Sequence, residues 1–309
     1  MAHQHEGARP APGTTAAARY RNRMSWVLAV LGVGVLVQVI GALVSGSLAL
    51  LADAGHMLTD GLGVAVALVA TVLAARPARA HRTFGLQRAE ILAALVNGLV
   101  VGGLAVAVIV GALMRFDDPT PVDGLSMLLF AVVGLLANAV CLMLLMPGRQ
   151  ESLNVRGAYL EVLGDLLGSV GVVLASVIIM ITGWLHADAV ASLLIGLLIL
   201  PRAFALLRAV TRVLLEAAPE GLDLTEVRSH ILGVEGVVGV HDLHAWTITS
   251  GVPVLTAHVV VDDDTAAMCG SGAILDQLHS CLAGHFDVEH STFQIEPIGH
   301  IDHEHADHA

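Results

Sequence analysis

Long apolar segments separated by short polar ones make up most of the chain before residue 214. Each segment is near or above the ~20 residues that a helix needs to cross the hydrocarbon core of a bilayer. The six segments lie at about residues 24–44, 48–74, 89–114, 125–146, 158–182 and 187–212. The pattern predicts a polytopic α-helical membrane protein with six transmembrane helices, in a domain at residues 24–214.

Arginines gather at alternate ends of these segments. They lie between the second and third segments, between the fourth and fifth, and toward the end of the sixth: Arg76, Arg79, Arg82, Arg88, Arg149, Arg156, Arg202, Arg208 and Arg212. Loops rich in Arg stay in the cytoplasm, whereas an opposite loop, at 116–124, is acidic. We therefore expect a multi-pass protein of a cell (plasma or inner) membrane with both termini in the cytoplasm.

The polar parts at the two ends of the chain differ in kind. Residues 1–23 are rich in Ala, Pro and Gly and lack the apolar core of a signal peptide, so they predict a disordered cytoplasmic lead. Residues 215–297 have the composition of a small soluble α+β domain. Residues 298–309 hold four His among acidic residues, which predicts a flexible His-rich tail.

The domain at 215–297 shows alternating helix and strand patterns in the order αββαβ. The expected elements are a helix at 223–232 with Asp223 as its cap, strands at 237–248 and 252–261, a helix at 274–286 and a strand at 291–296. This order predicts helices that cover one face of a small sheet.

Composition narrows the class of protein. Of the 309 residues, 56% are hydrophobic and 14% charged, with a mean hydropathy of +0.78, which excludes an ordinary soluble domain. The net charge of −12 argues against nucleic acid as a partner. The three Cys form no close pair, so the sequence offers neither a disulfide framework nor a thiolate metal site.

Two predicted membrane helices carry ionisable residues at matching spacing. His56 and Asp60 stand four residues apart in the second helix, and Glu161 and Asp165 do so in the fifth. Residues at this spacing share one helix face. Ionisable groups at mid-membrane cost roughly 2.5–3.5 kcal/mol each on insertion scales, so they mark function. If the two faces meet, four ligands converge, which suits a tetrahedral divalent cation.

The charges of this set suggest coupling to protons. One imidazole and three carboxylates exceed the charge of one divalent cation, and closely spaced carboxylates have raised proton affinity. The competing hypothesis is that these groups form ion pairs that lock the helices together. No Arg is expected in the middle of any span, which favours metal ligation. Asp53, seven residues before Asp60, either lines the exit path or caps the helix start.

Several stretches are similar to the cation diffusion facilitator family of zinc-type transporters. They are SGSLALLADAGHMLTD (45–60), HRTFGLQRAEILAALVNG (81–98), NVRGAYLEVLGDLLGSVGV (154–172), DAVASLLIGLLIL (188–200) and VHDLHAWTITSG (240–251). The resemblance implies six membrane helices and a cytosolic ferredoxin-like domain that pairs two protomers as a homodimer. It also implies that His56, Asp60 and the matching pair on the fifth helix bind the transported metal.

The chain departs from the common pattern at one ligand, because zinc-type members usually have His where this sequence has Glu161. The ligand set becomes chemically harder, with three oxygen ligands to one nitrogen, and the residues leave its selectivity among metals undecided. The resemblance further implies a regulatory metal site in the cytosolic domain at His241, His258 and Glu296. Surface or hydrogen-bonded histidines are the alternative for that cluster.

The sequence therefore predicts a secondary transporter, not an enzyme. We expect it to export divalent cations, zinc first and then cadmium, cobalt or iron, in exchange for protons. No catalytic residue or catalytic cofactor is expected, and Zn²⁺ is the transported and regulatory ion. The alternatives are a membrane-anchored metal sensor, a metalloenzyme without transport, and a channel.

Overall fold

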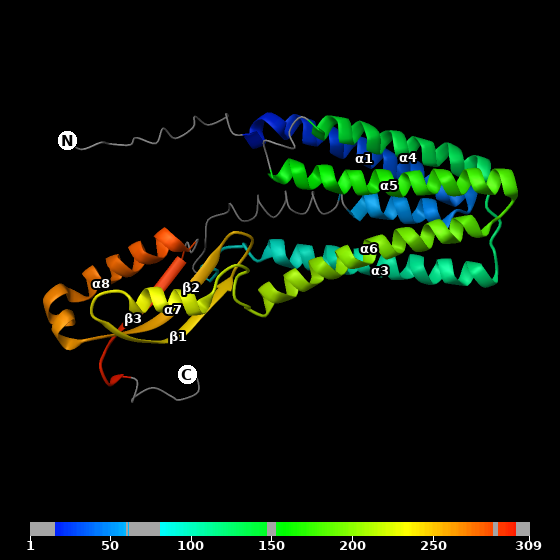
Figure 1. The fold of residues 1–309 in the computed structure, drawn as a ribbon. Helices are drawn as coiled ribbons and strands as arrows, with labels where there is room; N and C mark the ends of the chain where they lie inside the picture. The colour runs from blue at the N-terminus through cyan, green and yellow to red at the C-terminus, as the bar shows by residue number, and fades with distance from the viewer. Residues whose placement is uncertain (1–15, 60, 62–80, 147–152, 287–289, 301–309) are drawn as a thin grey trace. The chain divides into compact units, whose positions relative to one another are not determined.

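The structure is a computed structural model that describes residues 16–59, 61, 81–146, 153–286 and 290–300 (Figure 1). The chain divides into two compact units. The first lies within residues 1–68 and 96–207, and the second within residues 69–95 and 208–309.

The first unit is a bundle of apolar helices. Five helices in the described part of the chain are long and apolar enough to cross a membrane. They are α1 (Ala16–Ser45), α3 (Ala89–Asp117), α4 (Gly124–Leu145), α5 (Leu153–Thr182) and α6 (His186–Leu214). Five predicted spans are thus confirmed as helices, and the chain is a multi-pass membrane protein. The second predicted span is described only as the helix Leu48–Thr59, and most of its remainder lies outside the described residues.

The start of α1 corrects one prediction. The helix begins at Ala16, inside the segment that we expected to be disordered up to residue 23. Three consecutive alanines, which have the highest helix propensity, open the helix and extend it beyond the apolar span. Residues 1–15 lie outside the described part of the chain.

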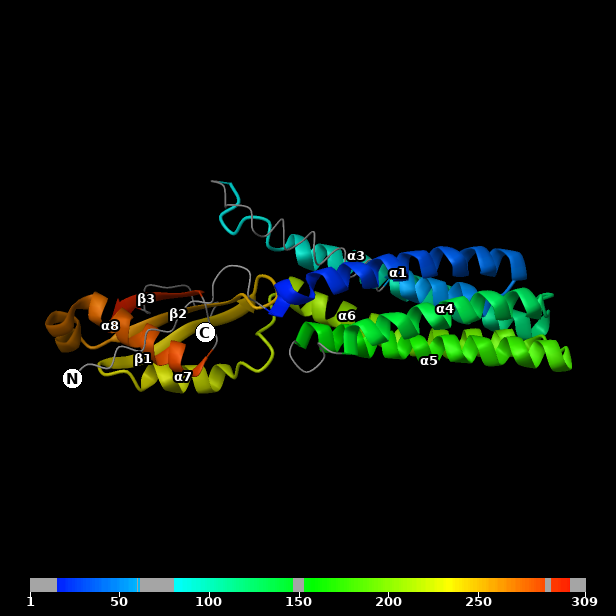
Figure 2. The ribbon, with the colours of Figure 1, turned by 90° about the horizontal axis from the view of Figure 1, so that it is seen from above.

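Small residues let the helices of the first unit approach closely. The helices α1, α4 and α5 run alongside one another in both ribbon views (Figures 1 and 2). A Cβ added at Gly41 of α1 would lie 2.4 Å from the Cβ of Phe130 on α4. On the other side of the bundle, a Cβ at Gly196 of α6 would lie 2.7 Å from Ile109 of α3. Close backbone approach of this kind is how membrane helices associate.

Substituting Gly41 tests this packing. Gly41→Ala is expected to destabilise the bundle by about 1–3 kcal/mol, because the new methyl group overlaps a ring anchored near its own backbone. Gly32→Ala on the same helix is the matched control, since nothing lies within 4 Å of its added Cβ. Thermal unfolding in detergent measures both variants. Equal melting temperatures for the two would contradict the proposed close packing.

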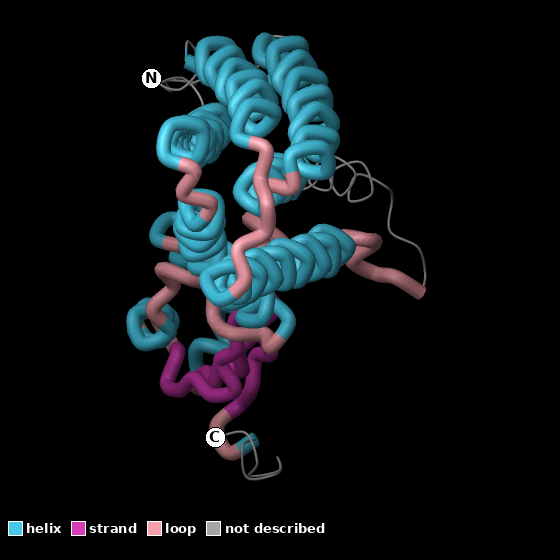
Figure 3. The backbone as a smooth tube through the Cα atoms, turned by 90° about the vertical axis from the view of Figure 1, so that its right-hand side faces the viewer, coloured by secondary structure: helices cyan, strands magenta, loops and turns pink. Residues whose placement is uncertain are grey.

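The second unit contains the strands of the described chain (Figure 3). Its elements follow the order α7 (Leu224–Leu232), β1 (Val237–Thr247), β2 (Pro253–Val261), α8 (Asp263–His285) and β3 (His290–Pro297). This is the predicted αββαβ order. The strands form one sheet in the order β1-β2-β3, with β1 and β2 antiparallel and β2 and β3 parallel.

Two details of the second unit bear on the predictions. The Asp223 side chain caps α7 by accepting from the Thr225 backbone N–H, as predicted, and this bond lowers the pKa of the Asp223 carboxyl. Helix α8 begins at Asp263, eleven residues before the predicted start at 274. Its backbone breaks at Gly270, where φ is 71°, and this interruption conceals the first part of the helix from a periodicity argument.

The core of the second unit lies against one face of the sheet. Leu255, Ala257 and Val259 on β2 pack with residues of α7 and α8, including Ile231 and Leu278. Since side chains alternate along a strand, His258 points to the opposite face. His241 is its direct partner on β1, so the two imidazoles lie side by side on the face that the helices leave uncovered.

Candidate metal sites

His56 and Asp165 meet in the interior of the helix bundle. His56 lies on the helix Leu48–Thr59 and Asp165 on α5, and the Nε2 atom of His56 is 3.1 Å from Oδ1 of Asp165. Only 9% of His56 and 2% of Asp165 are exposed. A nitrogen and an oxygen that converge in this way present two ligand atoms to one cation.

Of the two remaining predicted ligands, the structure describes only Glu161. Glu161 lies one turn before Asp165 on α5 and interacts electrostatically with Asp165, Arg202 and His56. It is exposed at the side of the bundle. Asp60 lies outside the described residues, so its position relative to the other ligands stays a prediction.

Arg202 corrects the expectation that no Arg reaches the ligands. It lies within α6, and its Nη1 atom is 3.0 Å from Nε2 of His56. Gly164 leaves the space for it, since an added Cβ there would meet the Arg202 guanidinium at 2.5 Å. The sequence places Arg202 toward the cytoplasmic end of the last helix. The position of Arg202 along its helix does not fix where its guanidinium lies, because the long side chain carries the charged group well away from the backbone.

Asp53 lies in a second polar group inside the bundle. Its Oδ2 atom accepts hydrogen bonds from Gln38 Nε2 at 2.7 Å and from Ser169 Oγ at 2.9 Å. Asn138 donates to the same Ser169 hydroxyl at 3.1 Å. All four side chains are at most 1% exposed, and they come from α1, the helix Leu48–Thr59, α4 and α5. Asp53 therefore does not cap a helix start.

The start of that helix is capped by a residue from α6, which the sequence analysis missed. The Asp188 carboxylate accepts from the backbone N–H groups of Leu48 at 3.0 Å and Ala49 at 3.1 Å, and from the Ser47 hydroxyl. Arg115 of α3 donates to it at 2.7 Å. Asp188 thus stabilises the helix that carries His56 and Asp53 and joins it to α3 and α6.

The three predicted residues of the second unit lie in contact with one another. Glu296 is the common partner, with Oε2 at 2.9 Å from Nε2 of His241 and Oε1 at 2.7 Å from Nδ1 of His258. Its carboxylate is 2% exposed and also accepts from Gln294 at 2.8 Å.

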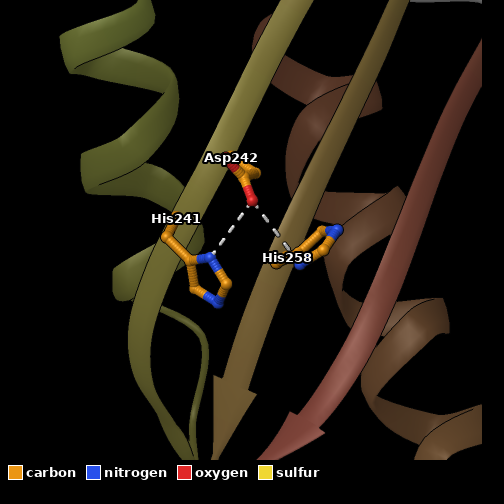
Figure 4. Close-up of side chains that lie close together, drawn as sticks. All are labelled: His241, Asp242 and His258. Carbon is orange, nitrogen blue, oxygen red and sulfur yellow. Dashed lines mark ion pairs between the residues drawn. The ribbon is translucent and has the colours of Figure 1, made fainter. Parts of the chain in front are cut away.

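Asp242 is a fourth member of this cluster that sequence reasoning missed. It lies at a bulge of β1, where the register with β2 shifts between His241 and His244, and its φ is +46°. The bulge turns the carboxylate toward both imidazoles, at 3.6 Å from His241 and 3.9 Å from His258 (Figure 4). In the described part of the chain, His241, Asp242 and His258 offer ligand atoms within 4.8 Å of one another. Two imidazoles and a carboxylate are ligands of the kind that a zinc-type ion takes, and Glu296 contacts both imidazoles beside them.

Models of known protein families match two consecutive parts of the chain. Residues 25–215 match the model of the cation efflux transmembrane domain, and residues 219–298 match that of the cation efflux protein cytoplasmic domain. The chain belongs to the cation efflux, or cation diffusion facilitator, family. The resemblance noted in the sequence is therefore confirmed, and the protein is a relative of metal cation efflux transporters.

Individual relatives within the family are similar over most of their length. The metal cation efflux system protein CzcD of Cupriavidus metallidurans is 45% identical over 269 residues, covering 87% of this chain and 84% of the relative. The zinc transporter ZitB of Escherichia coli is 44% identical over 267 residues, covering 84% and 82%. A cadmium, cobalt and zinc/H(+)-K(+) antiporter of Bacillus subtilis is 39% identical over 267 residues, covering 86% and 85%.

Proposed function

We propose that the chain exports Zn²⁺, or a similar divalent cation, from the cytosol in exchange for protons. The transport site consists of His56, Asp60, Glu161 and Asp165. The observation that carries this proposal is the 3.1 Å approach of His56 Nε2 to Asp165 Oδ1 between two apolar helices. The names of two relatives, a zinc transporter and a cadmium, cobalt and zinc/H(+)-K(+) antiporter, support it.

The ligand chemistry accounts for exchange. The four side chains carry about three negative charges when ionised, and a divalent cation balances two of them. When the metal leaves, the carboxylates gain affinity for protons because like charges are then held close together in a medium of low dielectric constant. Metal and protons compete for the same oxygen atoms, so alternating exposure of the site to the two sides couples their movements.

The arrangement in the membrane follows from the same account. Six helices span the membrane, with the segment that begins at Leu48 as the second, and both termini face the cytoplasm. The unit that carries α7, α8 and the sheet is a ferredoxin-like domain through which two protomers form a homodimer. Metal enters from the Arg-rich cytoplasmic side of a plasma or inner membrane.

Asp53 belongs to the pathway as a proton-binding carboxylate. It is buried and accepts two hydrogen bonds, and none of its interactions in the described part of the chain is with an Arg. An ionised carboxylate without a cation is costly in such surroundings, so a proton or a passing cation stabilises it.

Glu161 sets the choice of metal. Glu161→His in everted membrane vesicles is expected to shift preference toward zinc over manganese by about tenfold, because it replaces an oxygen ligand with an imidazole. A competition series for uptake measures the shift, with wild-type vesicles as the reference. An unchanged order and ratio of metals would remove Glu161 from the ligand set.

The cytosolic cluster binds a regulatory metal. Glu296→Gln in the full chain is expected to lower the number of Zn²⁺ ions bound per protomer by one, because it removes the carboxylate that contacts both histidines. Isothermal titration calorimetry measures this number. His244→Ala is the matched control, since its side chain is 60% exposed and is not among the residues whose ligand atoms lie within 4.8 Å of one another.

A metal uptake assay on the same variant separates the transporter from a membrane-anchored sensor. A transporter variant Glu296→Gln retains metal flux, whereas a sensor binds metal in its cytosolic domain and shows no flux in either form. Unchanged Zn²⁺ stoichiometry in Glu296→Gln would contradict the regulatory site alone.

A further inference from the structure

Arg202 brings a permanent cation to the metal-binding atoms of His56. Its Nη1 lies 3.0 Å from Nε2 of His56, the same nitrogen that is 3.1 Å from Oδ1 of Asp165. It also interacts electrostatically with Glu161. The guanidinium thus contacts one of the four groups assigned to the transported metal, His56, and interacts with a second, Glu161.

The chemistry of the two side chains decides which of them donates the hydrogen bond. Arg has only donors and keeps its charge in proteins, so the N–H of Arg202 donates and Nε2 of His56 accepts. The accepting lone pair is the one that Nε2 would give to a metal ion. With this tautomer, the facing atoms of His56 and Asp165 both carry lone pairs, and a nearby positive charge stabilises their close approach.

The surroundings of Arg202 suit a group that moves. The residue as a whole is exposed, its contact with His56 is only partly buried, and the long Arg stem lets the head group swing away from the ligands toward the membrane interface. Gly164 keeps a place open for the guanidinium, since an added Cβ would meet Nη2 at 2.5 Å. The Asp188 carboxylate, which pairs with Arg115 in a structural role, is instead only 1% exposed.

We infer that Arg202 is a tethered competitor of the transported metal, which occupies the ligand atom of His56 when no metal is bound and is displaced when metal enters. This inference rests on the proposed transport site. The tethered charge lowers the affinity for metal and so favours its release. It also offsets part of the repulsion among the carboxylates of the empty site.

Two independent substitutions remove the competitor. Arg202→Gln removes the charge, and Gly164→Ala excludes the guanidinium by its methyl group while the charge stays on the chain. Both are expected to tighten the His56-dependent binding of Zn²⁺, Arg202→Gln by about tenfold and Gly164→Ala by less. Damage to the fold would weaken binding, so the direction of the change separates competition from a structural role.

The measurement is a chelator competition titration of Zn²⁺ with the full chain in detergent at pH 8, where protons compete least for carboxylates. The His56→Ala variant defines the component of binding that belongs to the membrane site. Gly171→Ala on the same helix is the matched control, because nothing lies within 4 Å of its added Cβ. Arg202→Lys keeps a positive charge and is expected to retain a dissociation constant within about threefold of wild type.

Each outcome bears on one of the two claims. Unchanged or weaker His56-dependent binding of Zn²⁺ in both Arg202→Gln and Gly164→Ala would overturn the inference that Arg202 competes with metal. The same holds if Arg202→Lys binds Zn²⁺ as tightly as Arg202→Gln. Absence of any His56-dependent binding in the wild-type chain would overturn the proposed transport site, and the competitor with it.

Discussion

Replacing Asp165 with Asn is expected to reduce metal transport at least about 100-fold, which exceeds the loss typical for an outer-shell partner of a metal ligand. The carboxylate is almost wholly buried and faces Nε2 of His56 at 3.1 Å. An amide keeps the shape but loses the charge and one metal-binding oxygen. Zinc uptake into everted membrane vesicles measures the loss.

The matched control for this substitution is Asp118→Asn. Asp118 is an exposed Asp in the loop that follows α3, and its substitution changes the net charge by the same amount. It is expected to transport at the wild-type rate. Transport by Asp165→Asn at more than about a tenth of the wild-type rate, with equal protein in the vesicles, would show that the site is wrongly assigned.

Asp188→Ala is expected to destabilise the membrane unit by about 3–5 kcal/mol, the usual cost of removing one partner from a buried ion pair. The carboxylate is 1% exposed and satisfies Arg115, two backbone N–H groups and the Ser47 hydroxyl. Without it, the Arg115 guanidinium loses its ion-pair partner and keeps its bond to the Gly46 carbonyl, while the helix start loses its cap. Thermal unfolding in detergent measures the change.

Two further variants make the Asp188 prediction specific. Asp188→Asn keeps one acceptor oxygen and is expected to lose less stability than Asp188→Ala. Asp118→Ala, at an exposed site, is expected to unfold at the wild-type temperature. Equal melting temperatures for Asp188→Ala and Asp118→Ala would mean that the helix start does not depend on Asp188.

The elements were predictable because their signals are local and periodic. Apolar segments of sufficient length gave five of the helices, and alternation along the strands gave the order of the second unit. The four-residue spacing of Glu161 and Asp165 predicts one shared face of α5, on which Asp165 is buried and Glu161 is exposed. The resemblance to the cation efflux family identified the family correctly. The same signals could not fix the end of the second span, where Asp60 lies outside the described residues.

The features that escaped prediction depend on contacts between distant segments. Asp188 reads as an acidic residue in the first turn of its own helix, yet it caps another helix 140 residues earlier. Asp242 would face the helices in a regular strand, and only the bulge turns it toward the histidines. Arg202 reaches His56 through its long stem and through the space at Gly164, neither of which is visible in hydropathy.

The central claim is that metal moves against protons through the site of His56 and Asp165. The most direct test uses purified protein in liposomes that hold a zinc-sensitive dye, with a pH gradient imposed across the membrane. The account predicts that an acidic interior accelerates zinc uptake, that a protonophore abolishes the acceleration, and that Asp165→Asn shows none. Zinc uptake at the same rate with and without the gradient would contradict it.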